Sequence, residues 1–101
     1  MRQRTLKNGD TVSESDLHHA LAGLKQIAGD RQAIKTVRAF SDDQLGTPLT
    51  PKVGRQLHEA GLLYHFEDGV GLMDMAVRAV VRAAVDGRTN HVTLDEGQLV
   101  R

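Results

Sequence analysis

The sequence predicts a mainly α fold: a small single domain of about four helices with short terminal β-hairpins or strands. Its 101 residues are close to the common size of one domain. Hydrophobic residues make up 40% and charged residues 26%, which is typical of a globular chain. Apolar residues recur at helical spacing in four stretches. No linker, internal repeat or low-complexity stretch divides residues 1–101, which we interpret as one domain.

Residues 5–12 predict a short hairpin or an extended arm at the N-terminus. β-forming residues flank Asn8-Gly9, a dipeptide that favours the positive φ angles of a tight turn. Ser13 and Asp16 then resemble a capping box, with Asp in place of the usual Glu. Apolar residues follow at helical spacing, so we expect a first helix that ends at Gly29.

Asp30 is suited to cap a second helix, and Ile34, Val37 and Phe40 lie on one face of it. Residues 41–44 have the pattern of a fresh cap with Gln at the third position. We therefore expect a separate short helical turn over residues 41–46, followed by a loop.

Thr50-Pro51 predicts the start of a third helix, because Thr caps well and Pro fits the first helical position. Gly61 is expected to end this helix. Residues 62–66 then have the pattern of a strand, and residues 70–72 that of a return strand after a turn. A wing-like hairpin near 62–72 is one interpretation, and a loop that runs directly into the next helix is the other.

Residues 72–85 predict a fourth helix that is apolar except for one narrow stripe. Asp74, Arg78 and Arg82 are four residues apart, and Asp74 before Arg78 is the favourable order for an ion pair. A helix that is apolar on most of its circumference is either central in its own fold or shared with a partner.

Beyond Gly87, residues 91–94 alternate like a strand, residues 95–97 have the composition of a turn, and residues 98–100 have the pattern of a strand that pairs back. The expected core is aliphatic, because aromatic residues are only 3% of the chain. It comprises Leu17, Leu21, Leu24, Ile34, Val37, Phe40, Leu45, Val53, Leu57, Leu63, Phe66, Met73, Val77, Val80, Val81 and Ala84.

No catalytic or metal-binding pattern is evident. The chain has no cysteine, and its five histidines have no recognised ligand spacing, so we expect surface histidines and no native metal site. Asp42-Asp43 is explained by capping, and no catalytic template or phosphate-binding loop matches. We therefore predict no catalytic residues, no metal and no cofactor.

Two observations bear on location. No apolar stretch follows the basic N-terminus, so we expect no signal peptide. Residues 72–85 are about one third short of a membrane span. We expect a cytoplasmic protein that does not bind membranes.

Residues 41–72 have the order short helical turn, loop, helix and hairpin, and residues 59–62 read Glu-Ala-Gly-Leu. This stretch resembles the core of a winged helix-turn-helix domain. The resemblance implies that the helix beginning at Thr50 is a recognition helix, with Thr50, Lys52, Arg55 and Gln56 facing duplex DNA. Gly54 within that helix departs from the family pattern, because it costs about 1 kcal/mol relative to Ala. The excess of basic residues is also missing, since thirteen basic residues balance thirteen acidic ones.

Our function hypothesis is a non-catalytic regulatory or protein-interaction domain, binding to itself as a homodimer or to another protein. The fourth helix would form the interface, because its apolar surface is more than a small domain readily buries. The interface residues would be Met73, Ala76, Val77, Ala79, Val80 and Ala83. A helix buried centrally within one chain is the competing explanation. A winged-helix DNA-binding regulator is the alternative function, and a small enzyme or metal protein has no positive support.

Overall fold

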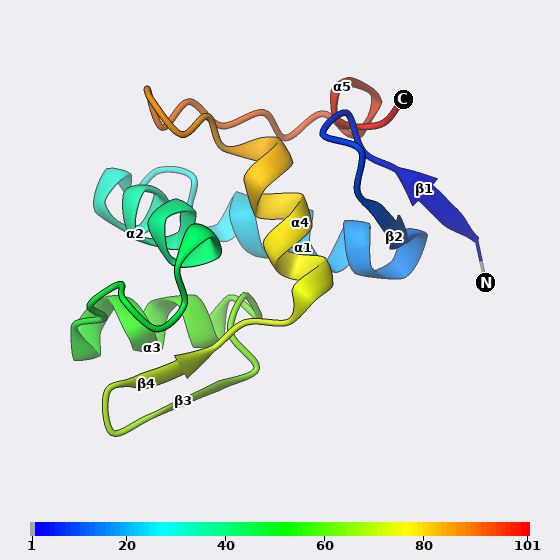
Figure 1. Ribbon diagram of the computed structural model, residues 1–101. Coiled ribbons are helices and arrows are strands. Elements are labelled where there is room, and N and C mark those ends of the chain that lie inside the picture. Colours follow the sequence, from blue (N-terminus) through cyan, green and yellow to red (C-terminus); the bar gives the residue numbers. More distant parts are fainter. Residues whose placement is uncertain (1) are drawn as a thin grey trace.

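Helix α4 (Met75–Ala84) lies at the centre of the fold and packs against both α1 (Glu14–Ile27) and α2 (Arg31–Asp42). The structure, a computed structural model, describes residues 2–101. Within them it has five helices and two antiparallel strand pairs (Figure 1). The other elements are β1 (Gln3–Thr5), β2 (Thr11–Ser13), α3 (Pro51–Glu59), β3 (His65–Glu67), β4 (Val70–Leu72) and α5 (Glu96–Leu99).

The first three helices begin where the sequence predicts. The side chains of Ser13, Asp30 and Thr50 each accept a hydrogen bond from the backbone N–H three residues further on. Each bond satisfies one of the N–H groups that the first turn of a helix leaves without a partner. The three predicted caps are therefore confirmed.

The N-terminal hairpin is also confirmed. Strands β1 and β2 pair with Arg4 opposite Val12, and Gly9 in the connecting turn has a φ of 94°. This is the left-handed region, where glycine carries no steric penalty. Val12 is buried, so the hairpin contributes directly to the core.

A hairpin, not a direct loop, occupies residues 65–72. Strands β3 and β4 pair with Phe66 opposite Gly71, and the turn residues Asp68 and Gly69 both have positive φ angles. Two central residues of positive φ are typical of tight hairpin turns. The first strand begins at His65 and not at residue 62, because residues 62 and 63 are leucines buried in the core.

The expected separate helical turn over residues 41–46 begins two residues later than predicted and is a single turn, in which the Thr47 N–H donates to the Asp43 carbonyl at 3.2 Å. Helix α2 continues to Asp42, and Ser41 is fully buried with its hydroxyl donating to the Arg38 carbonyl 2.6 Å away. Asp43 instead supports a simple turn by accepting a bond from the Gly46 N–H. Leu45, expected in the core, lies on that turn and is 96% exposed.

The expected ion pair between Asp74 and Arg78 does not form within the described part of the chain. Asp74 caps α4 by accepting a bond from the Ala76 N–H at 2.9 Å. The Arg78 guanidinium turns the other way and donates to the backbone carbonyls of Ser41 and Asp42. It thereby satisfies acceptors that the end of α2 leaves without intrahelical partners.

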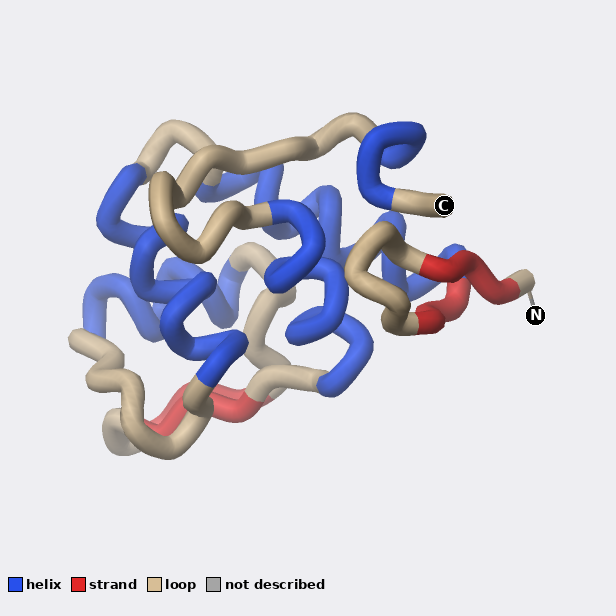
Figure 2. Tube along the Cα trace, turned by 45° about the horizontal axis from the view of Figure 1, so that its top comes forward, coloured by secondary structure: helices blue, strands red, loops and turns tan. Residues whose placement is uncertain are grey.

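The C-terminal segment pairs with the N-terminal arm. The expected turn at residues 95–97 forms as the start of the short helix α5, which Asp95 caps, and the Gln98 N–H donates to the Asp95 carbonyl at 3.0 Å. Val100 then forms a bridge to Leu6, and Val92 forms a bridge to Val85. Figures 1 and 2 both place this segment beside the β1–β2 hairpin. Leu6 and Leu99 are fully buried, although neither was expected in the core.

Among residues 2–101, no helix combines the length and the apolar character that crossing a bilayer requires.

Candidate functional site

Most of the interface predicted on α4 is wrong. Met73, Val77, Val80 and Ala83 are buried in the core of this chain, where α1 and α2 pack around α4. These four side chains are unavailable to a partner. Ala76 and Ala79 are only partly buried, so one narrow strip of the helix stays open.

This open strip borders a groove of about 490 Å³ between α4 and the β1–β2 hairpin. The hairpin is held near the helix by Asn8, whose amide donates to the Ala79 carbonyl at 3.4 Å. The groove has an apolar and a charged lining. The apolar part comprises Val12, Met75, Ala76 and Ala79, and the charged part Asp10, Asp74, Arg78 and Arg82. Two acidic and two basic residues therefore line one cavity.

Three arginines meet at the end of α2. Arg38 donates to the Val85 carbonyl at 2.8 Å and to the Asp42 carboxylate. Arg82 lies 3.3 Å from the other oxygen of Asp42, and Arg78 bonds the last carbonyls of the helix. These contacts fasten α2 to α4. Arg82 remains 46% exposed, so its guanidinium is also open to a partner.

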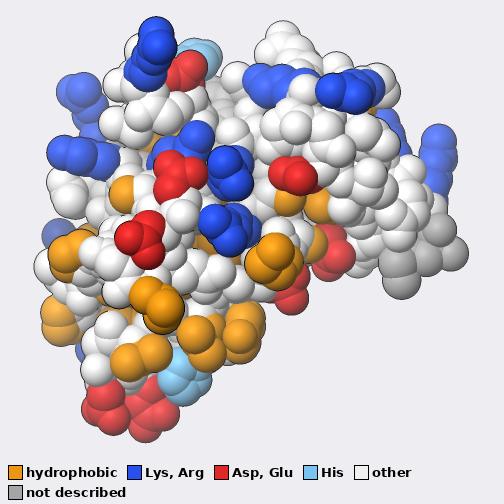
Figure 3. Space-filling model, viewed as in Figure 1, with side chains coloured by type: hydrophobic (Ala, Val, Ile, Leu, Met, Phe, Trp, Pro, Cys, Tyr) orange, Lys and Arg blue, Asp and Glu red, His pale blue; other side chains and the backbone are white. Residues whose placement is uncertain are grey.

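Large apolar side chains are exposed around β4 and the start of α4. Leu45 is 96% exposed, Met75 70% and Val70 53%. Figure 3 shows apolar side chains gathered over the loop after α2, β4 and the start of α4. We call Leu45, Val70 and Met75 the exposed apolar face.

The backbone of β4 explains why Val70 points outward. Residues on one strand alternate between its two faces. A side chain at Gly71 would collide with Leu49 and Leu63, so Gly71 faces the interior. Val70, on the other face of the strand, is therefore exposed, whereas Leu72 is half-buried.

Of the four residues expected to face DNA, two are exposed on α3 without a bond to the rest of the described chain and two use their side chains within the fold. Lys52 and Arg55 are exposed on α3. The Thr50 hydroxyl is used in the helix cap, and the Gln56 amide donates to Asp30 at 3.1 Å. The hydrogen bond from the Ala33 N–H lowers the pKa of the Asp30 carboxyl, and the bond from the Gln56 side chain lowers it further by a smaller amount. Gln56 is thus engaged inside the fold, through a partner 26 residues away that local sequence pattern did not indicate.

Gly54 allows the β3–β4 hairpin to pack closely on α3. A Cβ at this position would lie 2.3 Å from two atoms of the Phe66 ring. The outer groove between α3 and the hairpin, of about 420 Å³, is lined by Arg55 and His58 but also by acidic residues of the hairpin. The charge there is mixed.

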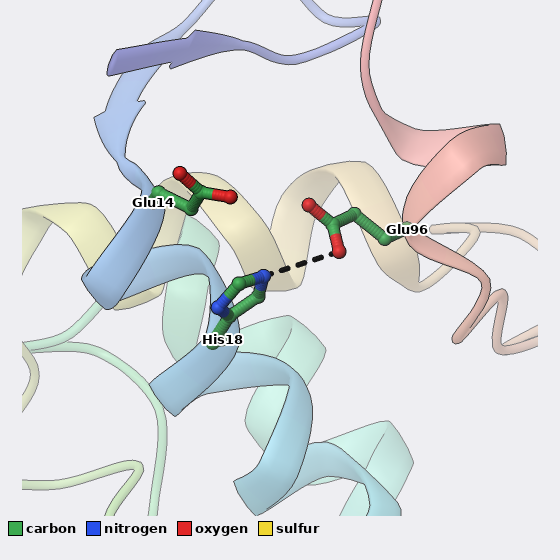
Figure 4. Close-up of side chains that lie close together, drawn as sticks. All are labelled: Glu14, His18 and Glu96. Carbon is green, nitrogen blue, oxygen red and sulfur yellow. Dashed lines mark hydrogen bonds and ion pairs between the residues drawn. The ribbon is translucent and has the colours of Figure 1, made fainter. Parts of the chain in front are cut away.

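Sequence reasoning also missed a cluster formed by Glu14, His18 and Glu96 (Figure 4). The His18 Nε2 lies 3.1 Å from a Glu96 oxygen, and potential metal-binding atoms of all three residues lie within 4.8 Å of one another. The Arg4 guanidinium lies 2.9 Å from Glu96 and 3.7 Å from Glu14. A cation would have to compete with Arg4 for both carboxylates. The contacts of Arg4 and His18 with Glu96 link β1 and α1 to α5.

Comparisons with protein-family models, curated proteins and solved structures found no match to this chain.

Proposed function

We propose that this chain is a non-catalytic protein-interaction domain that associates with itself through the exposed apolar face. The observation that carries the proposal is the exposure of Leu45, Val70 and Met75, together with the apolar side chains that Figure 3 shows over the loop after α2, β4 and the start of α4. Each large aliphatic side chain left in water forgoes about 1.5–3 kcal/mol of burial. Contiguous exposed patches of this kind mark interaction sites.

Leu45 supports the proposal because the fold makes no use of its side chain. The turn over residues 43–46 is stabilised by the bond from the Gly46 N–H to Asp43, and Leu45 is 96% exposed. A polar residue at this position would form the same turn without exposing an isobutyl group. The side chain of Leu45 is therefore available for a contact outside the chain.

Sedimentation equilibrium over a hundredfold concentration range tests the proposal. The wild-type mass should rise from 11.0 kDa toward twice that value. The double variant Leu45→Ser/Val70→Thr removes apolar surface but keeps the turn and the strand, and should remain a monomer. Ala22→Ser, on the exposed side of α1, is the control and should behave like the wild type. A wild-type mass of 11.0 kDa at every concentration would reject self-association.

Duplex DNA is a second candidate ligand, supported by one observation. The β3–β4 hairpin packs on α3 through Phe66 and Gly54, beside the exposed Lys52 and Arg55. A helix flanked by a hairpin is the arrangement that the winged-helix resemblance implies. The charge of this surface is mixed, so any binding would depend on few phosphate contacts and would be weak at physiological salt.

A further inference from the structure

A second cavity, of about 310 Å³, lies between α2 and the segment that follows α4. Its apolar lining comprises Ala28, the buried Ile34 and the half-buried Val92. Ligand pockets in proteins commonly measure about 300–1,000 Å³, so this cavity has room for one small molecule. No residue of the exposed apolar face lines it, so the cavity is separate from the surface on which we place self-association.

Two cations line this cavity. Arg31 and Lys35 are four residues apart on α2, and both are exposed. Cβ atoms at this spacing on a helix are about 5–6 Å apart, so a single anion can contact both side chains. Among residues 2–101, neither cation takes part in an ion pair. The fold therefore leaves two like charges, which repel each other at this spacing, without compensation.

The lining contains no acidic residue, unlike the groove beside α4 and the groove between α3 and the β3–β4 hairpin. The carboxylates closest in sequence are Asp30 and Asp86, and neither lines the cavity. Asp30 accepts bonds from the Ala33 N–H and the Gln56 amide. Asp86 accepts bonds from the backbone N–H groups two and three residues further on. Both carboxylates are thus engaged in caps and turns of the fold, and the charge that lines the cavity is positive.

We propose that this cavity binds a small phosphate monoester. The phosphate group lies between Arg31 and Lys35, and its apolar substituent lies against Ile34 and Val92. A phosphate monoester carries about −1.5 to −2 charges at pH 7, which matches two cations. Asn90, on the wall formed by the segment after α4, is half-buried and supplies amide N–H groups that can donate to a phosphate oxygen.

Titration of the ¹⁵N-labelled full chain with phenyl phosphate, followed by amide chemical shifts, tests the proposal. The shifts should saturate with a dissociation constant on the order of 1 mM and should be largest over residues 28–35 and 89–92. Inorganic phosphate and phenol each supply half of the ligand, so each should bind at least several-fold more weakly than phenyl phosphate.

Three variants distinguish the cavity from a general attraction of anions to the protein. Arg31→Gln and Lys35→Gln should each weaken phenyl phosphate binding about fivefold, because each removes one of the two charges. Arg55→Gln removes a charge that lines the groove beside α3, and it should leave the dissociation constant within about twofold. All three should keep the wild-type melting temperature, since the charges removed hold no ion pair within residues 2–101.

Ala28→Leu tests the apolar half of the site while both cations remain. The larger side chain occupies part of the cavity, so phenyl phosphate should bind at least about fivefold more weakly. Shifts that do not saturate, or that are as large around Arg55 as around Arg31, would overturn the proposal. Equal affinity for inorganic and phenyl phosphate, or wild-type affinity in the Arg31→Gln and Lys35→Gln variants, would also overturn it. Saturable shifts over residues 28–35 and 89–92 that weaken in all three cavity variants, but not in Arg55→Gln, would support it.

Discussion

The Phe66 ring occupies the space that a side chain at Gly54 would need, with two ring atoms 2.3 Å from the position of a Cβ. Glycine within a helix normally costs about 1 kcal/mol relative to alanine. In α3 this cost is offset by the packing of the β3–β4 hairpin. The glycine that departs from the winged-helix pattern thus has a structural reason.

Gly54→Ala should destabilise the fold by about 1–3 kcal/mol despite the better helix propensity of alanine, because the added methyl group displaces Phe66. Urea unfolding would measure the change. Gly29→Ala is the control, since a Cβ at Gly29 meets no atom within 4 Å, and it should be neutral or slightly stabilising. A more stable Gly54→Ala protein would contradict the close packing.

The stability that Asp30 contributes to the fold should be lost in acid. Bonds from the Ala33 N–H and then from Gln56 lower the pKa of its carboxyl in the folded state. Its stabilising contribution is therefore present above the unfolded pKa of about 3.9 and is lost as the pH falls through the lower folded value. Asp30→Asn keeps a capping side chain but cannot titrate, so its unfolding free energy should fall less steeply from pH 5 to pH 2. Parallel curves for the two proteins would contradict this prediction.

Lys52 should contribute to any binding of duplex DNA. Lys52→Ala removes one exposed cation on α3 and should reduce the slope of log affinity against log salt by about 1. Lys25→Ala, on α1, is the matched control and should leave the slope unchanged. Fluorescence anisotropy with a labelled random duplex at about 50 mM salt is a suitable assay, since non-specific contacts are strong there. No detectable binding by the wild type under these conditions would reject the DNA hypothesis.

The Glu14, His18 and Glu96 cluster should hold no transition metal after purification, because Arg4 already lies beside both carboxylates. Elemental analysis of untagged, dialysed protein measures this directly. Arg4→Gln removes the competing charge and should increase zinc affinity in a titration, whereas Arg88→Gln should not. One zinc or nickel per chain surviving dialysis of the wild type would show that the cluster is a metal site.

The features that sequence could predict are those set by neighbouring residues. The caps at Ser13, Asp30 and Thr50 each depend on a bond to the third residue onward, and the turn at Gly9 depends on its own φ. Such patterns are local and can be recognised from a single sequence.

The features that sequence could not predict depend on distant partners. Gln56 looked free on the surface of α3 but bonds Asp30, and His18 meets Glu96 across 78 positions. The continuous apolar pattern of α4 could not distinguish a central helix from a shared one, because both require the same composition. Leu45 was expected inside because it is a leucine, although its turn projects it into solvent.

The bridge between Leu6 and Val100 has a consequence for how the molecule opens. The N–H of Lys7 donates to the Leu99 carbonyl, and the N–H of Arg101 donates to the Thr5 carbonyl. The termini, which normally fray independently of each other, are here coupled. Pulling either one away removes a fully buried leucine from the core, so both ends should become exposed to solvent in one cooperative event.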